Sequence, residues 1–314
     1  MKIHYFDLHQ PIQFDEDITA CIGYFDGLHL GHQKLIERVL NHTKEDGSVP
    51  SLITFDPDPW TIIKHLDNIP HITPMRERIE IGEQLGIRNW IILRFEEEMQ
   101  NLSVEQFHER VLKPLHLKTL VCGYDFHYAS KGQGSVDTLR SQTNFQIDVV
   151  EEVSSEHKKI GSSRIEELIE LGDVEKAAQF MGRYYTMSGY VKKGSQMGRK
   201  FGFPTANLQL KDLYVIPKQG VYVGGVKVDG IWHAAILNIG HNPTYNFQEN
   251  TSIEAHLLDF ECDLYNKNVV FKFCHYIREE KKFQNAEALV EQLHCDKESA
   301  KAYIEARKEN VLCD

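Results

Sequence analysis

The sequence predicts an α/β protein of two parts: an N-terminal doubly wound parallel sheet, and a C-terminal antiparallel β-barrel followed by a terminal helix. In the first half, short apolar runs alternate with stretches whose apolar residues recur at helical spacing, which is typical of strands and crossover helices. From residue 184 to 273 the runs become short and β-rich, with turn signals between them, which favours a barrel. Because the pattern changes near residues 182–185, and 314 residues suffice for two domains, we expect domains of residues 1–182 and 183–314.

Composition narrows the class of protein. The net charge of −11 argues against a broad nucleic-acid surface, although a few cations and backbone amides suffice to bind a small anion. No apolar run approaches 18 residues, and the first residues lack a signal-peptide core, so we expect a cytoplasmic protein with no membrane partner. The six cysteines include no Cys-x-x-Cys pair, so we expect no structural zinc, and their scatter along the chain predicts reduced, mostly buried thiols.

The first half alternates predicted strands and helices. Pro74 begins one helix and Gly86 ends it. Ligands of such sheets bind beyond the carboxyl ends of the strands, so the loops there are the candidate sites. The predicted strands span 18–26, 49–55, 90–95, 119–126 and 147–153, and the helices span 30–45, 74–85 and 104–112.

The second half begins with two predicted helices, at 162–171 and 173–181, the latter capped by Asp173 after Gly172. A last helix is expected over 286–309. The β-rich runs between them are 185–191, 220–228, 231–239, 252–258 and 268–273.

The turn at residues 23–32, Gly-Tyr-Phe-Asp-Gly-Leu-His-Leu-Gly-His, joins the first strand to the first helix. It carries His29 and His32 beside the free N–H groups of a helix N-terminus, which suits a bound phosphate chain. The alternative is an ordinary strand–helix turn with incidental histidines, since the chain has 16 of them.

Two further loops follow predicted strands. The carboxylates of the Asp-Pro-Asp-Pro loop at 56–59 can hold a cation or a ribose. The alternative is a loop stiffened by its prolines with no binding role. The segment Gly-Tyr-Asp-Phe-His at 123–127 lies at the same expected edge of the sheet.

A second anion site is predicted where the helix at 162 begins. Two hydroxyls, Ser162 and Ser163, lie beside two cations, Lys159 and Arg164. An ordinary serine N-cap explains the same pattern. The sequence contains neither a Gly-x-x-x-x-Gly-Lys-Ser/Thr loop nor a Gly-x-Gly-x-x-Gly fingerprint, so nucleotide binding must rest on these other segments.

The turn at 23–32 resembles the His-x-Gly-His signature of the nucleotidylyltransferase superfamily, and its context resembles the FMN adenylyltransferase module of bacterial bifunctional FAD synthetases. The segment Gly-Phe-Pro-Thr-Ala-Asn at 202–207 is similar to the signature of riboflavin kinases. Further matches follow in family order: Gly-Val-Tyr at 220–222, Asn-Ile-Gly at 238–240, Pro-Thr-Tyr at 243–245, Ile-Glu-Ala-His at 253–256, Asp-Leu-Tyr at 263–265 and Arg-x-x-x-Lys-Phe at 278–283. The resemblance implies a nucleotidylyltransferase domain and a six-stranded barrel kinase domain.

In the kinase half, phosphoryl transfer to a hydroxyl requires a metal that neutralises the phosphate charge, backbone donors that hold the phosphate, and a base near the hydroxyl. Thr205 and Asn207 offer neutral oxygens for Mg²⁺ and phosphate, and Gly198 allows close approach of the nucleotide. The resemblance implies that Glu254 is the base for the riboflavin 5′-hydroxyl, and a salt-bridged strand residue is the alternative. It also implies that Arg278 contacts the flavin, with a surface ion pair as the alternative.

For the N-terminal half, the resemblance implies attack of the FMN phosphate on the α-phosphorus of ATP, with pyrophosphate leaving and no covalent intermediate. His29 and His32 then stabilise the triphosphate and the transition state. The residues implied to bind nucleotide are Gly23, Phe25, Asp26, Gly31, Ser162, Ser163 and Arg164, and those implied to bind flavin are Asp56 and Asp125.

Three segments depart from the family pattern in this half. Asp58 replaces a His within Pro-His-Pro, and Tyr128-Ala129 replaces Phe-Gly. Glu166 replaces an Arg, which reverses a charge near the expected phosphates and would weaken ATP binding. Two alternatives to a bifunctional enzyme with ATP, Mg²⁺, riboflavin and FMN therefore stay open: a relative with an intact kinase and a weakened adenylyltransferase, and a flavin-binding regulator without turnover.

Overall fold

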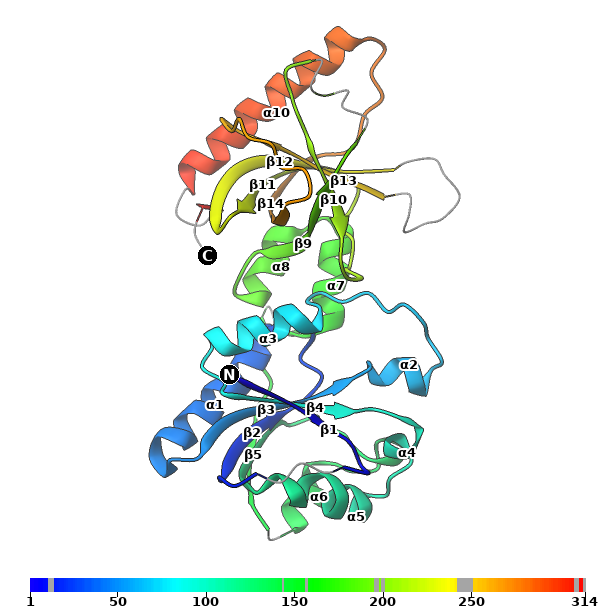
Figure 1. The fold of residues 1–314 in the computed structure, drawn as a ribbon, viewed down its shortest axis with the longest axis vertical. Coiled ribbons are helices and arrows are strands. Elements are labelled where there is room, and N and C mark those ends of the chain that lie inside the picture. Colours follow the sequence, from blue (N-terminus) through cyan, green and yellow to red (C-terminus); the bar gives the residue numbers. More distant parts are fainter. Residues whose placement is uncertain are drawn as a thin grey trace. The chain divides into compact units, whose positions relative to one another are not determined.

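The computed structural model describes residues 1–10, 14–142, 144–155, 158–194, 198, 201–241, 251–307 and 311–312. Contacts between residues divide the chain into two compact units, Met1–Ser162 and Ser163–Asp314, each with its own sheet (Figure 1). This division assigns the two helices before residue 182 to the barrel unit, whereas the domain boundary at 182/183 stays a prediction. The Pro-Thr-Tyr motif at 243–245 lies outside the described residues.

The N-terminal unit is built on a sheet of six parallel strands in the order β1-β4-β3-β2-β5-β6. Strand β1 lies at the edge of the sheet and its side chains are mostly exposed. Its sequence therefore has no apolar alternation and did not predict a strand. The strands are β1 (Lys2–Phe6), β2 (Ile18–Ile22), β3 (Val49–Asp56), β4 (Asn89–Arg94), β5 (Leu117–Gly123) and β6 (Gln146–Val150). The short strands β7 (Ser154–Ser155) and β8 (Lys158–Lys159) form a separate hairpin.

Successive residues of the central strands enter two different cores. In β4, Trp90 and Ile92 belong to the core beneath α1 and α3, whereas Ile91 and Leu93 belong to the core on the opposite face. This alternation follows from the pleat of a strand. Figure 1 shows α1 and α3 on one face of the sheet and α4, α5 and α6 on the other. The predicted doubly wound parallel sheet is confirmed.

Most elements of this unit follow the predicted ranges, and two differ. The first predicted strand ends earlier, at Ile22, because Phe25 has φ 61° and the chain turns there. The helix predicted over 104–112 continues after Phe107 as a π-helical turn. The helices are α1 (Leu30–Asp46), α2 (Pro59–Ile63), α3 (Met75–Gln84), α4 (Glu97–Gln100), α5 (Val104–Phe107) and α6 (Val136–Ser141), and the short helical turns are η1 (Asp26–Leu28), η2 (His108–Leu112), η3 (Lys113–Leu115) and η4 (Ser130–Gly132).

The C-terminal unit contains a closed barrel of six antiparallel strands in the order β10-β13-β12-β11-β14-β9, as the resemblance implied. The strand β10 was missing from the runs read off the sequence. The strands are β9 (Tyr185–Lys192), β10 (Ala206–Leu210), β11 (Gly220–Val228), β12 (Ile231–His241), β13 (Thr251–Leu257) and β14 (Asn268–Arg278). The helices are α7 (Ser162–Leu171), α8 (Val174–Met181) and α10 (Ala286–Ala306).

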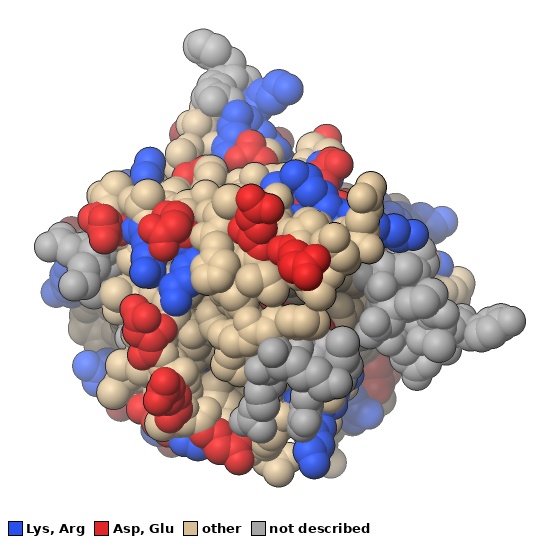
Figure 2. All heavy atoms as spheres, turned by 90° about the horizontal axis from the view of Figure 1, so that it is seen from above, with Lys and Arg blue, Asp and Glu red and all other residues tan. Residues whose placement is uncertain are grey.

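The terminal helix α10 packs on the outside of the barrel. Its buried residues Ala300 and Ile304 join a cluster with Val223 of β11, Ile236 of β12 and Cys274 of β14. The face of the molecule in Figure 2 carries both acidic and basic side chains, separated by uncharged residues.

The described cysteines are free thiols, and Cys21, Cys122 and Cys274 are buried. Burial raises the pKa of Cys122 to about 11. The prediction of reduced, largely buried thiols is confirmed for these three, whereas Cys262 and Cys295 are exposed.

The contact between Gly82 and Trp90 gives a test of core packing. A Cβ on Gly82 would lie 2.3 Å from the Cζ3 atom of the Trp90 ring. Alanine in place of a helical glycine normally gains about 1 kcal/mol, but overpacking a rigid ring costs about 1–3 kcal/mol. We expect Gly82→Ala to lower the free energy of unfolding of the N-terminal unit, measured by urea titration with circular dichroism. The control Gln84→Ala, at an exposed position of the same helix, should change it by less than about 0.5 kcal/mol.

Candidate functional site

The two histidines of the turn stack against each other at the start of α1. Their ring centroids are 3.6 Å apart with an angle of 18° between the planes. His29 is the N-cap of α1, and its Nδ1 accepts the backbone N–H of His32 at 3.4 Å. An accepting Nδ1 leaves the proton of a neutral His29 on Nε2, where it can be donated to a ligand. A Cβ on Gly31 would lie 3.1 Å from the His29 ring, which explains the glycine between the histidines.

The histidine turn borders a cavity of about 330 Å³ at the carboxyl ends of β2, β5 and β6. The cavity therefore unites three of the four segments predicted from the sequence. Its lining includes Gly23, Phe25, His29, Gly31 and His32 from the turn, Gly123–His127 after β5, and Lys159–Ser162 before and at the start of α7.

Polar groups across the cavity contact one another. The Lys159 ammonium forms an ion pair with Asp125, and it lies 5.5 Å from the centre of the Tyr124 ring. The Tyr124 hydroxyl donates to Glu152 at 2.7 Å, and this hydrogen bond raises the pKa of Tyr124 to about 12. An anionic ligand that contacts Lys159 must compete with Asp125.

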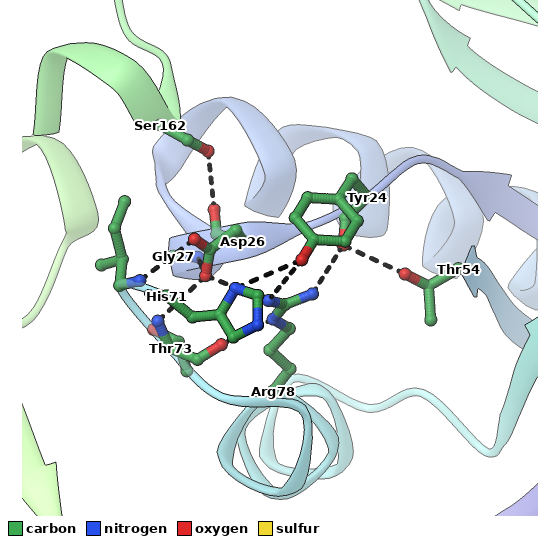
Figure 3. A network of polar contacts seen from close by, with 9 residues as sticks. Tyr24, Asp26, Gly27, Thr54, His71, Thr73, Arg78 and Ser162 are labelled. Atoms are coloured by element: carbon green, nitrogen blue, oxygen red, sulfur yellow. Dashed lines mark hydrogen bonds and ion pairs between the residues drawn. The ribbon is translucent and has the colours of Figure 1, made fainter. Parts of the chain in front are cut away.

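The side chain of Asp26 is enclosed by protein donors rather than turned to the cavity. Its carboxylate accepts the N–H groups of Gly27 at 2.9 Å, Ile72 at 3.0 Å and Thr73 at 2.9 Å, and lies 3.3 Å from Nη2 of Arg78 (Figure 3). The Ser162 hydroxyl donates to the Asp26 backbone oxygen at 2.9 Å. Asp26 therefore holds the turn in place, and direct contact of its carboxylate with a nucleotide stays a prediction.

The other residues predicted for this half lie in different surroundings. Asp56, at the end of β3, is exposed and is absent from the lining of the cavity. Asp58 is buried and caps α2 by accepting the N–H of Trp60 at 2.8 Å. Ser163 is exposed, and the Arg164 guanidinium lies 4.4 Å from the centre of the Phe180 ring. Their proposed ligand contacts stay predictions.

In the C-terminal unit, the candidate residues meet on neighbouring strands of the barrel. Asn207 of β10 lies opposite Glu254 of β13, and the Thr205 hydroxyl donates to the Glu254 carboxylate at 3.0 Å. Glu254 is half-buried on the outer face of β13, since its neighbours Ile253 and Ala255 are buried. Carboxylate, hydroxyl and amide oxygens are thus gathered at one point.

Thr205 and Asn207 also line a cavity of about 90 Å³. A Cβ on Gly194 would lie 2.4 Å from Nδ2 of Asn207, and one on Gly198 would lie 2.2 Å from the backbone oxygen of Phe203. The approach to backbone at Gly198 requires glycine, whereas a side chain at position 194 would displace the Asn207 amide. No group of three or more His, Cys, Asp or Glu side chains that could hold a metal ion occurs among the residues that the structure describes.

Arg278, predicted to contact flavin, makes a bidentate ion pair with Asp296 of α10. Its Nε and Nη2 donate to the two carboxylate oxygens at 2.9 and 2.6 Å, and Gln292 donates to the same carboxylate at 2.9 Å. The Asp296 side chain is only 2% exposed. This ion pair links the end of β14 to α10. Because Asp296 is buried, it is not the surface ion pair of the alternative, and contact of Arg278 with flavin stays a prediction.

Comparison with known proteins assigns both units. Residues 181–304 match the family model described as riboflavin kinase, and residues 12–164 match the model described as FAD synthetase. Over 304 residues the chain is 34% identical to a bifunctional riboflavin kinase/FMN adenylyltransferase of Listeria monocytogenes, covering 95% of this chain and 97% of that one. The chain belongs to this family.

A second relative carries the same description, and one solved structure shares the fold. The protein of the same description from Bacillus subtilis is 35% identical, with 96% of this chain and 98% of the relative covered. A solved Streptococcus pneumoniae structure, described as a macrolide-efflux protein, superposes with a TM-score of 0.88 at 28% identity, covering 95% of this chain and 98% of that one. Within the described part of this chain, no helix has both the length and the apolar character needed to cross a bilayer.

Several residues of the site carry no signal in the sequence. Arg78 and His71 lie beside the histidine turn, but each is a single polar residue outside the motifs of the bifunctional family. Only the fold brings them together.

Ala129 occupies the place where the family pattern has glycine, and its backbone is strained. Its φ and ψ angles are 62° and −177°, a region that glycine adopts and that costs other residues about 1–3 kcal/mol. The neighbouring Tyr128 and Gly134 are held together by two backbone hydrogen bonds of 3.2 and 2.9 Å. This pairing keeps Ala129 in its conformation.

We expect Ala129→Gly to stabilise the N-terminal unit. Relief of the strain outweighs the about 0.4–1 kcal/mol that glycine costs through the unfolded chain, which leaves a gain of about 1 kcal/mol. Urea unfolding measured by the fluorescence of Trp60 and Trp90, in a Trp232→Phe background, reports on this unit alone. An unchanged or lower midpoint would contradict the strain. The control Ala20→Gly, in a buried strand, should destabilise.

Proposed function

We propose that this chain phosphorylates riboflavin to FMN in its barrel unit and adenylylates FMN to FAD in its N-terminal unit. Membership of the bifunctional family over nearly the whole chain carries the proposal. Incubation with riboflavin, ATP and Mg²⁺, and separately with FMN, ATP and Mg²⁺, tests it by chromatography of the flavins. FMN without FAD leaves only the kinase, and no product in either tube favours a binding protein.

At the kinase site, Glu254 accepts the proton of the riboflavin 5′-hydroxyl, whose oxygen attacks the γ-phosphorus of ATP while ADP leaves. The hydrogen bond from Thr205 supports this role, because it orients the Glu254 carboxylate toward the Gly-Phe-Pro-Thr-Ala-Asn segment at 202–207. Thr205 and Asn207 would hold Mg²⁺, which supplies neutralisation of the phosphate charge. Their neutral oxygens suit a cation that keeps several waters and binds mainly to the phosphates.

At the N-terminal site, the phosphate of FMN attacks the α-phosphorus of ATP, and pyrophosphate leaves. The chain contributes position and charge stabilisation. The stacked pair of His29 and His32 on the cavity wall is the observation that supports this role. Asp125 and Ser162 line the same cavity and are the proposed flavin or nucleotide contacts.

For the kinase, we expect Glu254→Gln to lower the rate of FMN formation by about 10²–10⁴-fold, since the amide keeps the shape of the side chain but cannot accept the proton. Formation of FAD from supplied FMN should not change, and this second activity is the control within the same molecule. A variant that still makes FMN at the wild-type rate would refute the base assignment.

For the adenylyltransferase, we expect His29→Ala to lower FAD formation by about 10²–10³-fold and to leave FMN formation unchanged. Because His29 also caps α1, His29→Asn is the matched control: asparagine restores the cap but not the imidazole. If the asparagine variant recovers wild-type FAD formation, His29 acts only as a cap.

A further inference from the structure

Arg78 is a buried cation that neither proposed reaction mechanism uses. Its side chain is 1% exposed, although it lies near the first turn of α3. Its Nε donates to the Thr73 backbone oxygen at 2.6 Å, and its Nη1 donates to the Tyr24 backbone oxygen at 3.1 Å. Its Nη2 lies 3.3 Å from Asp26. Figure 3 shows one guanidinium joining the turn and the loop at 71–73.

The backbone that Arg78 holds is the one that leads to the histidines. Phe25, Gly27 and Leu28 have φ angles of 61°, 78° and 37°, and the first and last are disfavoured for residues with a side chain. The Tyr24 carbonyl receives a second hydrogen bond, from Thr54 of β3 at 3.0 Å. Because the Asp26 carboxylate is bound as well, the turn is held both before and within the strained segment, ahead of His29.

Tyr24 extends the network to the loop before α3. Its hydroxyl accepts from Nη2 of Arg78 at 3.3 Å and lies 3.2 Å from Nδ1 of His71. Burial raises the pKa of Tyr24, while the charge of Arg78 opposes the shift, so the hydroxyl stays protonated at neutral pH. The guanidinium also lies 4.5 Å from the centre of the Tyr24 ring. Arg78 and Tyr24 therefore couple the histidine turn to the loop at 71–73.

We propose that Arg78 is a positioning residue for adenylyl transfer: it holds the Tyr24–Leu28 backbone so that His29 and His32 meet the phosphates, and together with Tyr24 it ties the loop at 71–73 to that turn. The proposal rests on the proposed function of this unit. Its effect is confined to FAD formation, because each contact listed above lies within the N-terminal unit.

The test compares Arg78→Lys with Arg76→Lys. Lysine keeps the charge but cannot donate to Thr73, Tyr24 and Asp26 from one planar group. Since a displacement of about 1 Å can cost 10²-fold in rate, we expect kcat for FAD formation to fall at least about tenfold, with FMN formation unchanged. Arg76, whose side chain is 56% exposed on the same helix, is the matched control and should change neither rate.

A double-mutant cycle separates positioning from a loss of folded protein. If Arg78 acts through His29, Arg78→Lys should lower kcat by less than about twofold in the His29→Asn background, whereas a folding defect lowers both backgrounds equally. Tyr24→Phe, which keeps the ring and the backbone contacts, is the milder variant if Arg78→Lys does not fold, and it should show the same coupling. Equal falls in both backgrounds, or no fall, would overturn the proposal. A wild-type chain that forms no FAD would instead refute the function on which it rests.

Discussion

The N-terminal site depends on a buried carboxylate, Asp26, and the guanidinium of Arg78 beside it. The carboxylate is almost fully removed from water, yet three backbone N–H groups and one cation surround it. Removing one partner of such a buried pair typically costs about 3–5 kcal/mol, because a charge is left unpaired. The pair can therefore impose a strained turn on Phe25 and Leu28, and that turn delivers two stacked histidines to the mouth of a cavity. The geometry of the histidine turn is thus a consequence of this buried ion pair.

The barrel unit uses a different device for the same purpose. Its key residues are brought together by strand register: Asn207 pairs with Glu254, and Asn238 lies opposite Glu254 on the other side of β13. Register is rigid because a slip of one residue would turn every side chain to the other face. The loop that leads into β10 is then held by the hydrogen bond from Thr205 and by the close approaches at Gly194 and Gly198. A site on paired strands needs no buried ion pair to position it.

The departures from the family pattern have different physical consequences. Asp58 is used as a helix cap, so a carboxylate at this position is satisfied within the unit. Ala129 carries a strained backbone that its neighbours Tyr128 and Gly134 hold in place. Arg164 and Glu166 lie on α7, where Arg164 stacks on Phe180. The changes at Asp58 and Ala129 are thus absorbed by local structure, and the stacked histidines border a cavity.

The sequence alone determined the fold class, most of the element ranges and the motif residues. It did so because parallel strands that enter two cores are apolar throughout, and because the Gly-rich signatures reflect local geometry, such as Gly31 beside the His29 ring and Gly194 beside Asn207. The exposed edge strand β1 lacked that pattern and was not predicted. Only the tertiary structure decided that Asp26 faces Arg78 rather than the cavity, and that Arg278 faces Asp296. The first pair is 52 positions apart in the chain and the second is 18. The cost of burying a charge selects its partner, and this cost exists only once the chain has folded.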